Sequence, residues 1–236
     1  MPSSADPFPV IGVELGARME NTALCVVEHV YMPTGEYFDK TTYERYSGVA
    51  DLVAHEKVAS EFHVRHLERR TPPVRYAGVA ERVGELAETV GEGLLVIDIT
   101  RTGRPVYGII KPAVEEALAD TKHEVRLCPI TVTGIAGGVS HSPDTGYLAP
   151  RRDLVSAALL LFEQEQLKIA QALDLASTLT KEFENFKPKP DPVDDLEGWR
   201  LAKNDDLVLS VAMSVWAAGR LVRKVEDVPV GSLGVA

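Results

Sequence analysis

The chain has 236 residues, a net charge of −10 at pH 7 and a hydrophobic fraction of 45%. This length suits one domain with a sizeable core, and the mean hydropathy of −0.04 is ordinary for a soluble globular protein. No apolar run approaches the roughly 20 residues of a membrane span, and the first residues lack signal-peptide character, so we expect a cytoplasmic protein without a membrane segment. The acidic charge argues against broad, nonspecific nucleic-acid binding but leaves room for a local basic groove.

Strand patterns dominate the first seventy residues. Apolar runs rich in β-formers predict strands over 9–16 and 22–32, joined as a hairpin by a polar turn. Residues 37–46 look extended, whereas 49–56 fit a short helix or a loop. Alternation of apolar and polar residues predicts a half-exposed strand over 61–70.

Helices and strands alternate in the middle of the chain. Helical spacing of apolar residues predicts a helix over 75–91 and another over 104–119. Between them, 94–99 is a continuous apolar run, which is typical of a strand buried on both faces. A further strand is predicted over 125–133.

The last third is predicted to be mainly helical. Residues 138–147 form a loop or a hairpin tip, 151–172 one long amphipathic helix, 172–186 a second helix and 205–222 a final one. The whole chain is interpreted as one domain over 1–236, with disordered residues 1–8, a flexible proline-rich connector over 187–198 and a tail over 223–236.

The two cysteines, Cys25 and Cys128, fall in predicted strands and show no metal-binding or CxxC spacing. We therefore expect reduced core residues rather than a zinc site or a disulfide.

Carboxylates mark three of the predicted elements. Glu14 lies near the end of the first strand, Asp98 near the end of the buried strand, and Asp205 and Asp206 open the last helix. Structural roles explain some of these positions, because Asp205 and Asp206 suit a helix start and Glu14 suits a solvated strand end. Asp98 is harder to explain structurally, since a carboxylate in a buried strand is costly without a partner.

Three motifs carry a resemblance to a known family. They are Gly12-Val-Glu14-Leu-Gly16, Val96-Ile-Asp98-Ile-Thr100-Arg-Thr102-Gly103 and Asn204-Asp205-Asp206-Leu207-Val208. With these three motifs in this order, the chain resembles the nuclease domain of phage terminase large subunits, which belongs to the ribonuclease H-like superfamily. The resemblance implies an α/β, three-layer fold with a central mixed β-sheet flanked by helices.

The resemblance also implies a metal-dependent DNA endonuclease that uses two Mg²⁺ or Mn²⁺ ions and a water nucleophile. Glu14, Asp98, Asp205 and Asp206 would be the catalytic, metal-binding carboxylates, with Asp98 or Glu14 bridging the ions and either Asp205 or Asp206 completing one site. Crowded carboxylates predict raised pKa values in the metal-free protein. Glu14 departs from the family, which typically has Asp there, so its longer side chain changes the ligand geometry.

The implied partner is double-stranded DNA. Arg101, Arg104, Arg151 and Arg152 are the candidate phosphate contacts, whereas a solvated face is expected for most of the other basic residues, which are Arg65, Arg69, Arg70, Lys187 and Lys189. The sequence contains no GxxxxGK[S/T] phosphate loop, so we do not expect this chain to package DNA unaided. It could be a separate subunit that works with an ATPase, a remnant of a prophage gene, or a domain put to another use.

Two alternatives remain open. One is a noncatalytic, ribonuclease H-like interaction or assembly module of a phage or prophage, which Glu14 and the missing motor favour. The other is an enzyme of the sugar-kinase and actin-like superfamily, which is weaker because its two glycine-rich phosphate loops are not visible in the sequence.

Overall fold

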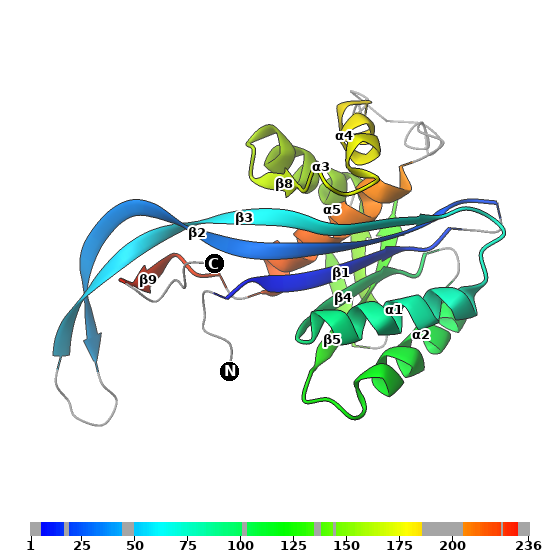
Figure 1. Ribbon diagram of the computed structural model, residues 1–236, viewed down its shortest axis with the longest axis horizontal. Coiled ribbons are helices and arrows are strands. Elements are labelled where there is room, and N and C mark those ends of the chain that lie inside the picture. Colours follow the sequence, from blue (N-terminus) through cyan, green and yellow to red (C-terminus); the bar gives the residue numbers. More distant parts are fainter. Residues whose placement is uncertain are drawn as a thin grey trace.

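A single mixed sheet divides the molecule into three layers (Figure 1). The computed structural model describes residues 6–16, 19–43, 50–100, 103–134, 138–143, 145–185, 205–222 and 224–230. Helices α1 (Tyr76–Val90) and α2 (Gly103–Leu118) cover one face of the sheet. Helices α3 (Arg151–Glu163), α4 (Ala176–Asn185) and α5 (Asp206–Leu221) cover the other. This is the predicted ribonuclease H-like arrangement.

The sheet combines parallel and antiparallel strands. Its order is β6-β7-β5-β4-β1-β2-β3-β8, and β9 also pairs with β3. The strands are β1 (Phe8–Glu14), β2 (Thr22–Tyr43), β3 (Ala50–Arg70), β4 (Gly93–Asp98), β5 (Val125–Thr133), β6 (Ser140–Ser142), β7 (Gly146–Pro150), β8 (Leu167–Ile169) and β9 (Asp227–Pro229). Neighbouring strands pair in parallel along β1, β4, β5 and β7 and between β3 and β8. The pairs β1–β2, β2–β3, β3–β9 and β6–β7 are antiparallel.

The two central strands bring predicted site residues to one edge. All six residues of β4 are buried, as the apolar run predicted. Strand β1 pairs with β4 in parallel, with Val13 opposite Ile97. The next residues along the two strands are Glu14 and Asp98, so parallel pairing places both carboxylates at the same carboxyl end of the sheet.

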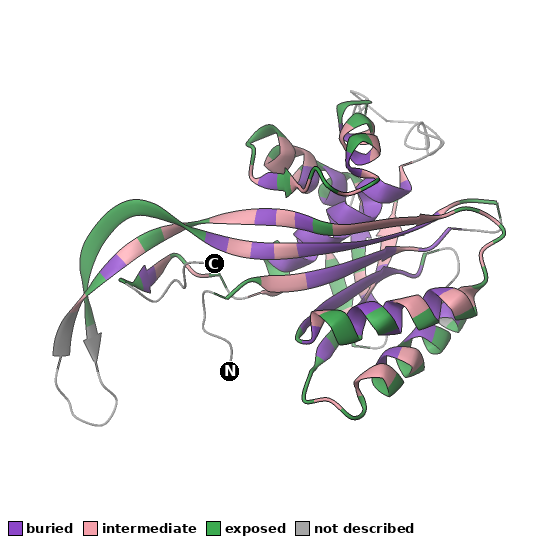
Figure 2. Cartoon of the chain, in the orientation of Figure 1, coloured by how far each residue is buried: buried purple, intermediate pink, exposed green. Residues whose placement is uncertain are grey.

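Helix α5 packs unusually close to β1. Its residues from Asp206 to Ala218 are all buried, and Figure 2 shows this helix and the central strands as the buried interior. A Cβ atom added to Gly12 would lie 2.2 Å from Ser214 Oγ and 2.3 Å from the Ser210 carbonyl oxygen. The small residues on both elements therefore allow the contact that fixes α5 beside β1.

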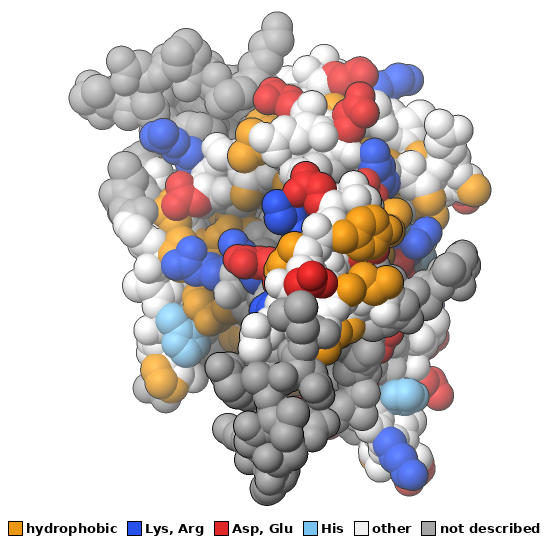
Figure 3. Space-filling view, turned by 90° about the vertical axis from the view of Figure 1, so that its left-hand side faces the viewer, with side chains coloured by type: hydrophobic (Ala, Val, Ile, Leu, Met, Phe, Trp, Pro, Cys, Tyr) orange, Lys and Arg blue, Asp and Glu red, His pale blue; other side chains and the backbone are white. Residues whose placement is uncertain are grey.

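Strands β2 and β3 form a hairpin, and both extend well beyond the strands predicted over 22–32 and 61–70. They pair from Thr22 opposite Arg70 to Tyr43 opposite Ala50, so the short helix or loop predicted over 49–56 is wrong. The hairpin projects from the body of the molecule (Figure 1). Figure 3, which looks onto this end, shows hydrophobic side chains among charged ones, in agreement with the exposure of Tyr37 and Phe38.

The single helix predicted over 151–172 is also wrong. Helix α3 ends at Glu163, and Glu165 has a positive φ of 55°. The chain then turns back, with Gln166 N donating to the Leu161 carbonyl at 2.8 Å, and β8 pairs with β3. The second predicted helix corresponds to the shorter α4.

The remaining differences lie at the ends and in one loop. The predicted loop over 138–147 contains the paired strands β6 and β7, in keeping with a hairpin tip. The predicted tail contributes β9, while the connector 187–198 and residues 1–5 lie outside the described residues. Within the described residues, no helix combines the length and apolar character needed to cross a membrane. Cys25 and Cys128 are buried free thiols, as predicted.

Candidate active site

Carboxylates from three elements meet at the carboxyl end of the central strands. Glu14 ends β1, Asp98 ends β4, and Asp205 immediately precedes α5. The negative charges of Asp98 and Asp205 both act on the Glu14 carboxyl, so both groups lie within electrostatic range of Glu14. We call Glu14, Asp98 and Asp205 the carboxylate cluster.

Asp98 is held in place by the residue two positions after it. The residue is only 7% exposed, and its Oδ1 accepts a hydrogen bond of 2.7 Å from the Thr100 backbone N–H. The Thr100 hydroxyl also donates to Oδ1, while its oxygen accepts a 2.7 Å hydrogen bond from Val132 N on β5. Thr100 therefore couples the Asp98 carboxylate to the neighbouring strand and fixes its orientation.

The surroundings of Glu14 shift its pKa upward. Burial raises its pKa well above the ordinary value, and the charge of Asp98 and a hydrogen bond shared with Asp98 raise it further. The positive charge of Arg151 acts in the opposite direction. Glu14 Oε2 is enclosed and has no hydrogen-bond partner among the described residues. The side chain as a whole is half-buried, so a solvated strand end does not account for the enclosed Oε2.

Asp205 occupies the N-cap position of α5 but does not serve as a side-chain cap. In the described structure its side chain makes no capping hydrogen bond. Its Oδ2 instead accepts a hydrogen bond from Nη2 of Arg151, the first residue of α3, in an ion pair. The helix-cap explanation therefore does not account for the Asp205 carboxylate.

Asp206, the next residue, faces different partners. Its Oδ2 accepts a 2.6 Å hydrogen bond from Arg69 Nε at the end of β3, and its Oδ1 lies 3.4 Å from Asn21 Nδ2. Arg69 also donates through Nη2 to Glu182 Oε1 on α4, at 2.5 Å. We call Arg69, Asp206 and Glu182 the arginine clamp; it joins β3, α4 and α5 just behind the carboxylate cluster.

Sequence reasoning missed the arginine clamp. Arg69 was expected on a solvated face, yet its side chain is only 14% exposed. Glu182 was not predicted as a site residue, and burial raises its pKa despite the opposing effect of Arg69. Its Oε2 has no hydrogen-bond partner among the described residues. Strand alternation was the available signal, because it turns residue 69 toward the α5 face and residues 68 and 70 away.

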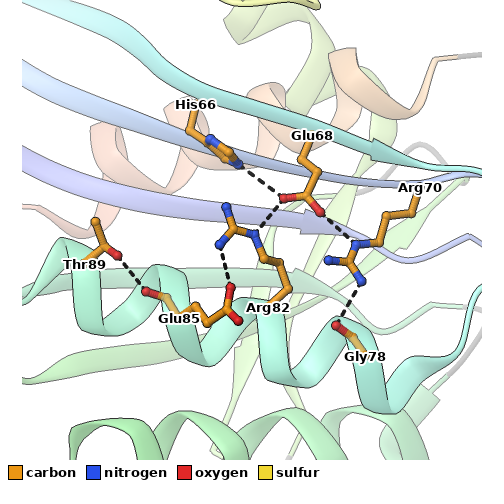
Figure 4. Close-up of polar contacts among 7 residues, drawn as sticks. All are labelled: His66, Glu68, Arg70, Gly78, Arg82, Glu85 and Thr89. Carbon is orange, nitrogen blue, oxygen red and sulfur yellow. Dashed lines mark hydrogen bonds and ion pairs between the residues drawn. The ribbon is translucent and has the colours of Figure 1, made fainter.

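The opposite face of β3 carries a separate network. Figure 4 shows Glu68 between Arg70 and Arg82, with both arginines donating to its carboxylate at 2.8 Å. Arg70 also donates to the Gly78 carbonyl of α1 at 3.0 Å. These contacts attach α1 to β3, so Arg70 belongs to helix packing and not to the carboxylate cluster.

The other predicted basic residues divide into three groups. Arg151 contacts the carboxylate cluster, and its neighbour Arg152 is exposed at the start of α3. Arg65 pairs with Glu28 on the sheet, away from the cluster. Arg101, Lys187 and Lys189 lie outside the described residues, and the side chain of Arg104 is not described.

The donor set suits a hard divalent cation. Three carboxylates converge, and one of them has an enclosed oxygen without a partner among the described residues. Among the described residues, no group of three or more His, Cys, Asp or Glu side chains is arranged so that it could hold a metal ion as it stands. The chemistry of the site thus fits Mg²⁺ or Mn²⁺, whereas the present side-chain positions would have to adjust.

Comparisons with known proteins support the fold assignment. No protein-family model matches the chain, and no curated protein is significantly similar in sequence. The fold is similar to the manganese-soaked nuclease domain of human cytomegalovirus terminase, with a TM-score of 0.53, 12% identity and coverage of 94% of this chain and 88% of that chain. The inhibitor-bound form of that domain gives a TM-score of 0.52, with 14% identity and coverage of 90% and 84%. The chain therefore has the ribonuclease H-like fold of terminase nuclease domains.

Proposed function

We propose that this chain is a metal-dependent endonuclease that hydrolyses double-stranded DNA at the carboxylate cluster. The observation that carries the proposal is the convergence of Glu14, Asp98 and Asp205 from two parallel strands and a helix start. Holding three carboxylates together in a partly buried position costs free energy, which a bound cation would offset. The similarity in fold to a terminase nuclease domain supports the same interpretation.

We assign the ligand positions to Glu14, Asp98 and Asp205, and a supporting position to Asp206. Two Mg²⁺ or Mn²⁺ ions, when bound, would lower the pKa of an attacking water and stabilise the charge on the leaving oxygen. Thr100 would keep the Asp98 carboxylate oriented throughout. Asp206 would keep the start of α5 in place, because Arg69 already engages one of its oxygens at 2.6 Å.

The basic residues near the cluster would bind the DNA backbone. Arg151 and Arg152 begin α3 beside Asp205, and Arg101 and Arg104 follow Asp98 in the sequence. Guanidinium groups suit phosphate recognition, and a small basic surface is enough for local contact in an acidic protein. In phage or prophage DNA packaging, the nuclease would work together with a terminase-type ATPase.

The test is cleavage of supercoiled plasmid by the purified protein with Mn²⁺, Mg²⁺ or EDTA. We expect nicking and linearisation with either metal and none with EDTA. Asp98→Asn should abolish cleavage while leaving the circular dichroism spectrum unchanged, because the amide keeps the shape but loses the charge. Cleavage by Asp98→Asn at the wild-type rate would remove Asp98 from the mechanism.

A noncatalytic binding module is the second candidate. The ion pair between Arg151 and Asp205 favours it, because a protein cation already neutralises part of the carboxylate cluster. Binding of Mn²⁺ without any plasmid cleavage, by folded protein at millimolar metal, would support this candidate over the endonuclease.

A further inference from the structure

Arg151 forms an ion pair with Asp205, one of the carboxylates that we propose as metal ligands. Its guanidinium is paired with Asp205 Oδ2, and the two side chains are only 18% and 19% exposed. The same positive charge favours ionisation of Glu14. One protein cation therefore acts on two members of the carboxylate cluster at once.

Arg69 does not replace Arg151 as a cation for the carboxylate cluster. Its Nε donates to Asp206 and its Nη2 to Glu182, so its hydrogen bonds serve the clamp behind the cluster. Among the described residues, Arg151 is thus the basic side chain that forms an ion pair with a member of the carboxylate cluster. Arg151 therefore supplies charge compensation to the cluster.

We propose that Arg151 is a built-in competitor of the metal ions: its guanidinium neutralises Asp205 in the metal-free protein and leaves Asp205 when a divalent cation binds. The released guanidinium then becomes available to a DNA phosphate. This inference rests on the proposed function, because it assumes that the carboxylate cluster binds metal.

Two physical facts favour displacement over coexistence. A guanidinium has only donors, so it cannot itself ligate a metal, and its charge repels a divalent ion bound to the same carboxylate. In addition, Arg151 Nε is buried and has no hydrogen-bond partner among the described residues. An unsatisfied buried donor is costly, so a second position in which Nε meets a phosphate oxygen or water is favoured once Asp205 is taken by metal.

The test is direct measurement of Mn²⁺ binding to DNA-free protein, with electron paramagnetic resonance reporting free Mn²⁺. We expect R151Q to bind Mn²⁺ more tightly than wild type by about tenfold or more, because the competing charge is gone. R151K keeps the charge and should stay within about threefold of wild type, as should the neighbouring, exposed R152Q. Equal or weaker binding by R151Q would overturn the proposal.

A measurement on the wild-type chain covers the case in which R151Q does not fold. Nuclear magnetic resonance of arginine Nε–H groups, with the Arg151 signal identified by its loss in R151K, should show that signal moving as Mg²⁺ is added. The Arg69 signal should move little, because its partners lie in the clamp. An Arg151 signal that stays fixed at saturating Mg²⁺ would overturn the proposal.

Asp98→Asn separates failure of this inference from failure of the proposed function. If wild type binds Mn²⁺, Asp98→Asn does not, and R151Q matches wild type, then the cluster is a metal site and only the competitor role of Arg151 is wrong. If none of the folded proteins binds Mn²⁺, the metal-dependent function itself is wrong and the competitor role falls with it.

Discussion

The arginine clamp should contribute strongly to stability. Replacing Arg69 with Met keeps much of the aliphatic stem but leaves the carboxylates of Asp206 and Glu182 without their cation, with only 10% and 12% of those side chains exposed. Removing one partner of a buried ion pair typically costs about 3–5 kcal/mol. At about 2.1 cal/mol/K of unfolding entropy per residue, a 236-residue chain has an unfolding entropy of about 0.5 kcal/mol/K. The melting temperature should therefore fall by about 6–10 °C.

The assay is thermal unfolding followed by circular dichroism, in EDTA at pH 7.5. Arg65→Met is the matched control on the same strand, because Arg65 pairs with Glu28 but its side chain is 52% exposed. An exposed pair contributes up to about 1 kcal/mol, so the control should shift the melting temperature by about 2 °C or less. If the two variants melt within 2 °C of each other, as an order-of-magnitude criterion, the clamp is not an important stabilising element. Adding Glu182→Gln to Arg69→Met should recover part of the loss, because it removes one uncompensated charge.

Three further outcomes follow from the geometry around the site. Because the folded-state pKa of Glu14 is raised, its contribution to metal-free stability is present at low pH and is lost as the pH rises through that pKa. Glu14→Gln should therefore melt higher than wild type at pH 8 in EDTA and show a smaller gain at pH 5; a pH-independent difference would contradict this sign. Gly12→Ala should lower the free energy of unfolding, measured in urea, by about 1–3 kcal/mol, because the new Cβ would overlap α5. Gly219 has open space around it among the described residues, so Gly219→Ala should leave the free energy of unfolding unchanged or raise it. Burial raises the pKa of the Cys25 thiol to about 11 and that of Cys128 to about 12, so a chromogenic disulfide reagent at pH 8 should modify neither in the native protein and both in urea; rapid reaction of native protein would argue against this burial.

Local patterns in the sequence were sufficient to predict the parts of the site that lie on regular, buried strands and helices. The apolar run before Asp98 could only suit a strand covered on both faces, and the structure has that strand as β4. The final helix was predictable because apolar residues recur along it. Its start placed Asp205 and Asp206 together, but local pattern could not separate their roles.

The errors arise where pairing over long distances decides the structure. The β2 arm of the distal hairpin is exposed over residues 32–41, so no buried face marks it, and the strand over residues 50–60 forms by pairing with this arm (Figure 2). Strand β8 has only three residues and forms because β3 offers an edge at Phe62. Arg69 is 137 residues from Asp206 and 113 from Glu182, so no spacing rule could connect them.

The separation of Asp205 and Asp206 follows from the geometry of a helix start. Asp205 is the N-cap and has non-helical backbone angles, whereas Asp206 is the first residue of α5, and the two carboxylates pair with different arginines. The close packing of α5 against Gly12 fixes which way each one points. Asp205 pairs with Arg151 and acts electrostatically on Glu14, while Asp206 pairs with Arg69. Asp205 is therefore placed to exchange the Arg151 guanidinium for a metal ion. Asp206 stays paired with Arg69, and this pair keeps the start of α5 in position while the exchange occurs.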